Sequence, residues 1–155
     1  MSTKERVKII SAILLVTCLA LPISSCSRYV DSNGKPIVKY DPKTHVNAKL
    51  VIKYNYPLER FNPKDIYNWL LLLCFIWPIP IILYRHKGTK KLIKNIIWSI
   101  EPLFALASSC YIWLKASLFA EPCIAAYLSI SANGIYGIAW LSEMLTKIFH
   151  KYRKN

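Results

Sequence analysis

Apolar residues are gathered into four stretches along this chain, with basic or polar segments between them. The first stretch, Ile9 to Leu21, is too short for a comfortable membrane crossing. The second, residues 66–84, has no formal charge, and as a helix it would be about 28 Å long, close to the thickness of a bilayer core. The third and fourth cover residues 96–114 and 122–145. The pattern predicts a mainly α membrane protein with three transmembrane helices.

Residues 1–25 have the three parts of a secretory signal: a basic start, an apolar run and small residues at the end. The stretch Ile23-Ser24-Ser25-Cys26 resembles the lipobox of bacterial lipoproteins, in which a branched apolar residue and two small residues precede a cysteine. This resemblance covers the signal alone. It implies cleavage before Cys26, attachment of a lipid to its thiol, and acylation of the new N-terminus with a fatty acid such as palmitate. The alternative is an uncleaved anchor in which Cys26 is an ordinary thiol near the membrane surface.

Residues 26–65 are polar and form the predicted exported segment. Asp31-Ser32-Asn33-Gly34 predicts a tight turn between two short extended pieces. From Ala48 to Tyr56, apolar and polar residues alternate, which predicts a half-buried strand that ends at Pro57. So few strands make a marginal fold, which would need the membrane, the helices or a partner to complete it. A linker with local strand character is the alternative.

Positive charge sets the expected orientation in the membrane. The chain has 21 Lys and Arg against 8 Asp and Glu, and the basic residues lie mainly between the apolar stretches rather than on one nucleic-acid-binding face. The loop 85–95 has five Lys or Arg and no acid, so the positive-inside rule places it in the cytoplasm. The tail 146–155 would then be cytoplasmic, and the segments 26–65 and 115–121 would be outside. The eight basic residues against four acidic ones in residues 27–65 do not follow this rule.

Two features inside the spans could affect packing and chemistry. Pro78 and Pro80 remove backbone donors and predict a kink in the first span. Glu101, followed by Pro102, lies within the second span, where a charged group is costly. Glu101 is therefore a candidate intramembrane carboxylate that handles protons or cations, or else an acid near the interface that is neutral or pairs with Lys94 or another lysine on the cytoplasmic side.

A row of small and polar residues predicts how the last two spans pack. Its members recur every four residues in the third span and so share one helix face: Ala125, Ser129, Asn133 and Gly137. Small residues let another backbone approach closely, and Asn133 could hydrogen-bond across the contact. The second span offers Ala105, Ser108, Ser109 and Ala116 as a matching surface. This favours an internal helical hairpin over self-association or partner binding.

The motifs searched for give no support to an enzyme. His45, His86 and His150 are far apart in the sequence, so no shared metal site is expected, and no pattern for a cofactor or a nucleophile is present. We therefore expect a small inner-membrane lipoprotein, an accessory protein whose partners are membrane lipids and another envelope protein or a second copy. The alternatives are an immunity protein against a membrane-active toxin and a small ion-conducting oligomer that uses Glu101.

Overall fold

The computed structural model describes residues 2–37, 48–59, 61–86, 91–118 and 120–153. The chain is mainly helical, as the sequence predicts, and it has a small three-stranded sheet whose third strand lies outside the segment expected to contain strands. Its elements, in order, are α1 (Thr3–Thr17), the 3-10 turn η1 (Cys18–Ala20), β1 (Ser24–Val30), β2 (Lys49–Asn55), α2 (Ile66–Ile76), α3 (Pro78–His86), α4 (Lys91–Ser117), β3 (Glu121–Pro122) and α5 (Ile124–Tyr152).

Two helices are long and apolar enough to cross a membrane, and a third crossing is available if a bent pair counts as one span. The two are α4, over Ile93–Ser117, and α5, over Ile124–His150. The pair α2 and α3 reaches the required length only together, and the two helices meet at an angle of 50°. The break falls between Trp77, the last cap of α2, and Pro78, which has no N–H to continue the helix. The kink predicted around the two prolines is therefore present.

The helices extend beyond the apolar stretches that predicted them. α4 begins at Lys91, within the expected loop 85–95, and α5 continues to Tyr152 through most of the expected tail 146–155. Apolar composition marks the part of a helix that suits hydrocarbon, whereas backbone hydrogen bonding continues into polar residues that favour helix. The predicted boundaries therefore describe hydrophobic segments rather than helix ends.

Helix α1 is an integral part of the helical bundle. Ser2 caps its start in a reciprocal arrangement with Glu5, in which each side chain accepts the other residue's backbone N–H. The helix packs chiefly against α5 and also contacts α2 and α3. Leu15 is fully buried, in a core that also contains Phe75 of α2 and Ile112 of α4. The segment that has the composition of a signal is thus packed into the bundle, chiefly on α5.

The sheet has the order β2-β1-β3 and is antiparallel throughout. Ser24 to Val30 pair with Asn55 to Lys49, and Ser24 and Ser25 also pair with Pro122 and Glu121. The predicted turn is present: Ile37 N–H donates to the carbonyl of Tyr29 at 2.8 Å, and Gly34 has a φ of 77°, a conformation that suits glycine. Val38, the end of the second predicted extended piece, lies outside the described residues.

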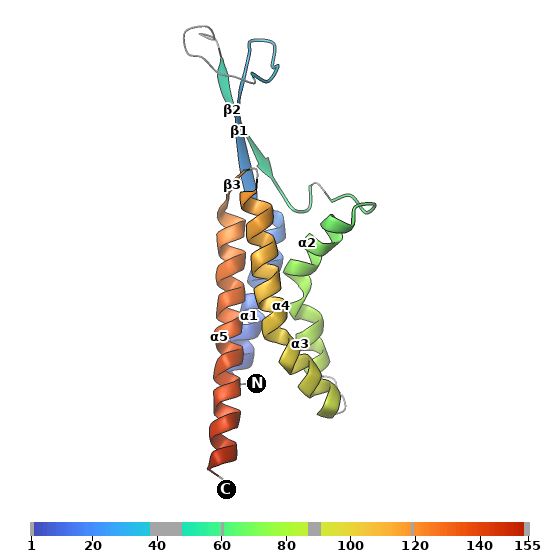
Figure 1. Cartoon of the computed structure of the whole chain (residues 1–155), viewed down its shortest axis with the longest axis vertical. Coiled ribbons are helices and arrows are strands. Elements are labelled where there is room, and N and C mark those ends of the chain that lie inside the picture. The colour runs from blue at the N-terminus through green and yellow to red at the C-terminus, as the bar shows by residue number, and fades with distance from the viewer. Residues whose placement is uncertain (1, 38–47, 60, 87–90, 119, 154–155) are drawn as a thin grey trace.

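The paired strands β1 and β2, which we call the ribbon, project beyond the helices (Figure 1). The sequence predicted a half-buried β2, and this prediction is wrong for the single chain. Six of the seven residues of β2 are exposed, and they include residues from both faces of the strand. Alternation predicts that a strand has an apolar face, but not that something covers it. At the base of the sheet Ile23 and Ser24 are buried against the bundle, and at the far end of β1 Val30 is buried as well.

Figure 1 shows that the segments group at two ends of the bundle. The N- and C-termini, the end of α3 and the start of α4 lie toward one end, and the three strands lie at the other. The segments expected in the cytoplasm are therefore together, as are those expected outside.

Candidate functional site

A lysine in the helical bundle lies between two carboxylates from two other helices. Lys8 of α1 places its Nζ 2.7 Å from Oε2 of Glu101 on α4 and 3.1 Å from Oε2 of Glu143 on α5. We call these three residues the ion cluster. It joins three helices that are far apart in the sequence, and these distances are those of charge-assisted hydrogen bonds.

Two of the three side chains in the ion cluster are almost completely buried. The side chains of Lys8 and Glu101 are 2% and 0% exposed, and that of Glu143 is 15% exposed. Removing a charge from water costs several kcal/mol, and this cost is offset only when partners are close and well oriented. Because Lys8 and Glu101 are buried from solvent, the close contact between their opposite charges offsets part of the cost of burying each one.

Aromatic rings line one side of the cluster. The Lys8 Nζ lies 5.1 Å from the centre of the Tyr136 ring, a cation–π distance, and Tyr136 is 1% exposed. The Tyr136 ring in turn meets Trp77 edge to face at 5.0 Å, and Trp77 stacks with Phe104 at 5.9 Å. Since Trp77 marks the bend between α2 and α3, this row of rings connects the bend to the surroundings of Lys8.

Glu143 borders an open cavity of about 870 Å³ at the end of the bundle where the two termini lie. Lys4, Lys94, Lys147 and His150 also line this cavity. The ion cluster has one formal positive and two formal negative charges, and Glu143 is its most exposed member. The excess negative charge can therefore be solvated at the cavity, while the pair of Lys8 and Glu101 stays dry.

The structure does not pair Lys94 with Glu101, one of the alternatives that the sequence left open. Lys94 is exposed and lines the cavity, and the ion pair of Glu101 is formed with Lys8 instead. Lys147, four residues after Glu143, has its Nζ 4.3 Å from the centre of the Trp98 ring. This end of α4 and α5 is also joined by a hydrogen bond from Trp140 Nε1 to the Trp98 carbonyl at 2.8 Å.

The row of small residues on α5 is only partly at the helix contacts. Ala125 and Ser129 are fully buried, and Asn133 Nδ2 donates to Ser108 Oγ of α4 at 3.0 Å. Gly137 is different, because it is half-buried and a Cβ built there would meet nothing within 4 Å. A spacing of four residues drifts about 40° per step around a helix, so the buried face passes instead to Tyr136 and Ala139.

Lys8 is the residue that sequence reasoning missed, because it was assigned to the basic start of a signal. The sequence feature that indicates its burial is spacing: Lys8, Ser11, Ala12 and Leu15 lie on one helix face, and all four are buried. A carboxylate within a span also calls for a base at similar depth. The sequence offers several lysines on the expected cytoplasmic side and does not show which of them meets Glu101.

Cys26, the predicted lipidation site, is exposed on β1 and lies opposite Lys53 of β2. The lipobox residues Ser24 and Ser25 are in the same strand, paired on both sides, and Ile23 before them donates its N–H to the carbonyl of Asn55 at 2.9 Å. The segment that a signal peptidase would have to bind therefore forms the centre of the sheet in the whole chain.

Among the described residues, no group of three or more His, Cys, Asp or Glu side chains could hold a metal ion. His45 and the side chain of His86 lie outside what the structure describes. Comparison of the chain with protein-family models, with curated proteins and with solved structures finds no match. Its fold and cluster define a small membrane-type helical bundle that is joined by buried charges and has an exposed β-ribbon at one end.

Proposed function

We propose that this protein is an accessory protein of the bacterial inner membrane that binds another envelope protein through its ribbon. The observation that supports this is the exposure of the edge strand β2, where Leu50, Ile52 and Tyr54 are 53%, 50% and 48% exposed. Single exposed apolar residues are ordinary, but three on one face of one strand form a patch suited to binding. Val51, on the opposite face, is 40% exposed as well.

The edge of β2 favours an added strand of particular chemistry. Its inner edge pairs with β1, and in the order β2-β1-β3 its outer edge has no neighbour among the described strands. Free backbone groups on such an edge can pair with an extended segment of another protein. Lys49 and Lys53 on the same strand would repel a second copy of this edge. The partner segment is therefore expected to be extended, apolar on one face and acidic on the other.

The rigid base of the ribbon suits such a role. Cys123 N–H donates to the carbonyl of Ile23 at 2.9 Å, and Ala125 N–H donates to that of Pro22 at 3.3 Å. These bonds fasten the start of β1 to the start of α5. Binding to a ribbon that is already held in place loses less conformational freedom than binding to a flexible segment.

Photo-crosslinking in native membranes tests this role. A photoreactive amino acid at Ile52 is expected to give an adduct with one other envelope protein, identified by mass spectrometry. The same amino acid at Lys35, which is exposed in the turn next to β1, is the matched control. Leu50→Asp should reduce the Ile52 adduct, because it places a charge in the apolar patch. Adducts only with lipid or with a second copy of the chain, or equal adducts from both positions, would contradict the proposal.

We also propose that α1 is retained as a membrane helix of the finished protein, with Cys26 as a free thiol. Cleavage before Cys26 would remove Lys8 and leave Glu101 buried without this partner, and breaking a buried pair costs about 3–5 kcal/mol. It would also uncover the face of α5 that α1 packs against. Lipidation of Cys26 belongs to the cleaved alternative, which the mass measurement described in the Discussion distinguishes.

A further inference from the structure

A second cavity, at the base of the ribbon, gathers positive charge. It has a volume of about 390 Å³, and its lining includes Arg28 of β1, Lys53 of β2 and Lys115 of α4. Among the residues that the structure describes, no acidic one lines it. Ser24, Asn55 and the thiol of Cys26 supply its uncharged polar groups.

Strand pairing explains why these residues meet. Ser24, Cys26 and Arg28 alternate along β1 and so share one face, and residues directly opposite each other on paired strands lie on the same face. Ser24 lies opposite Asn55, and Cys26 lies opposite Lys53. The polar face of the ribbon is therefore fixed by register and does not depend on flexible side chains meeting by chance.

The nearest acidic residue along the sheet is directed away from this cavity. Glu121 of β3 is paired with Ser25, whose side chain points to the opposite face from those of Ser24 and Cys26. None of the described carboxylates forms an ion pair with Arg28, Lys53 or Lys115. The three positive charges are consequently available to an anion from outside the chain.

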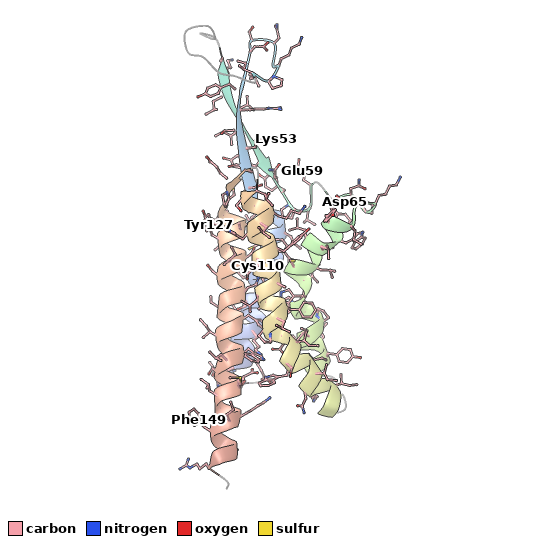
Figure 2. The ribbon with its side chains drawn as sticks, viewed as in Figure 1. Lys53, Glu59, Asp65, Cys110, Tyr127 and Phe149 are labelled. Atoms are coloured by element: carbon pink, nitrogen blue, oxygen red, sulfur yellow. The ribbon has the colours of Figure 1, made fainter. Side chains whose placement is uncertain are left out.

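The position of Lys115 sets the depth of the cavity. Lys115 lies near the end of the apolar part of α4, which finishes at Ser117. Its Nζ is 5.2 Å and 5.8 Å from the ring centres of Tyr67 and Tyr111, and tyrosines of this kind are typical of the level of lipid headgroups. Figure 2 shows Lys53 on the ribbon beyond the ends of α4 and α5, on the outer side of that level.

We propose that this cavity binds a phosphate group, either that of an anionic phospholipid headgroup or that of a small soluble phosphate compound. Arginine and lysine donate to phosphate oxygens, and the Asn55 and Ser24 side chains, which are 3.0 Å apart, add polar groups beside them. This site also gives a role to two basic residues, Arg28 and Lys53, of a segment expected outside the membrane, where the positive-inside rule would not place them. It does not depend on a protein partner of β2 or on its identity.

Lipid binding to the delipidated full chain in non-ionic detergent tests the site. Phosphatidylglycerol is titrated in and its retention is followed by native mass spectrometry, with phosphatidylcholine as the zwitterionic comparison and glycerol phosphate as a soluble competitor. We expect phosphatidylglycerol to bind more tightly than phosphatidylcholine and to be released as salt is raised. Competition by glycerol phosphate at concentrations similar to those of the lipid would assign the site to a soluble phosphate, whereas its failure to compete would assign the site to the lipid.

Matched variants connect the binding to this cavity. Arg28→Gln/Lys53→Gln is expected to weaken phosphatidylglycerol binding by about tenfold or more, since each cation near a membrane surface contributes measurably. Lys35→Gln/Lys64→Gln, which removes the same charge from exposed positions of the same segment outside the cavity, should leave it unchanged. Lys115→Gln tests the third cation without altering the ribbon. Equal binding of both lipids, or equal loss in the two double variants, would overturn the proposal.

Discussion

Lys8 and Glu101 are 93 positions apart in the sequence, yet their side chains meet at 2.7 Å in the interior of the bundle. The lysine belongs to a helix that has the composition of a signal. The glutamate belongs to a span in which Pro102 directly follows it. This pairing gives each of two otherwise unfavourable residues a physical reason to be where it is.

The unequal burial of the ion cluster predicts an order of effects on stability. Lys8→Met should lower the free energy of unfolding by about 3–5 kcal/mol, because it removes the cation that lies 2.7 Å from the buried carboxylate of Glu101. Glu101→Gln should be milder, by about 1–3 kcal/mol, since Lys8 keeps Glu143 at 3.1 Å. Thermal unfolding in detergent measures both.

The double variant Lys8→Met/Glu101→Gln separates pairing from general damage. It should be more stable than Lys8→Met alone, because it also removes the buried charge of Glu101, while Glu143 can be solvated at its cavity in both variants. Lys94→Gln, an exposed change on α4, is the control and should have no effect. If the two single losses simply add in the double variant, Lys8 and Glu101 do not act as a pair.

Retention of α1 predicts a particular mass for the mature protein. Intact mass spectrometry of protein purified from membranes should give the full chain, 17.9 kDa, and Cys26→Ala should not alter membrane association or processing. Palmitate labelling should be absent in both. A mature chain that begins at a lipid-modified Cys26 would show that the lipobox resemblance, and not the packing of α1, describes the finished protein.

The basic segments predict the orientation of the chain. Alkaline-phosphatase fusions should be active at residues 45 and 118 and inactive at residue 90 and at the C-terminus, because lysines and arginines are retained in the cytoplasm. The two termini lie at the end of the bundle away from the strands, which is compatible with this pattern. An active fusion at residue 90 would reverse the topology and place the ribbon inside.

Substitutions along one face of α5 should differ in a way that spacing alone does not predict. Ser129→Leu should destabilise the bundle by about 1–3 kcal/mol, because Ser129 is fully buried and the added atoms have no room. Gly137→Leu should be tolerated, since a Cβ there meets nothing within 4 Å. Gly137→Ala should raise helix stability by up to about 1 kcal/mol. Equal unfolding temperatures for Ser129→Leu and Gly137→Leu would contradict this distinction.

Local signals predicted the local structure well. The two prolines predicted the bend at Trp77, and the Asp31 to Gly34 sequence predicted the turn that leads from β1 to Ile37. The alternation from Ala48 to Tyr56 located β2 to within a residue of its bounds at each end. Each of these features is determined by neighbouring residues, since a missing N–H, a positive φ or a period of two acts over only a few positions.

Long-range relationships were not predictable in the same way. The pairing of β1 with both β2 and β3, the exposure of β2 and the meeting of Lys8 with Glu101 all depend on which segments lie side by side. A charge in a span shows that a partner is needed, but a single sequence does not show which of many lysines fills that need. The lysine that meets Glu101 is Lys8, in the first helix, which the sequence predicted to be removed as a signal.

The order of strands also determines when the sheet can be completed during synthesis. β1 is synthesised first but lies in the middle of the sheet, between β2, which follows after one polar segment, and β3, which follows only after α2, α3 and α4. One edge of β1 can therefore be paired early, whereas the other stays unpaired until α2, α3 and α4 have been synthesised. Pairing of Ser25 with Glu121 is consequently among the last events of assembly. A ribosome stalled before β3 would leave a protein with its ribbon formed but without the pairing of β1 with β3.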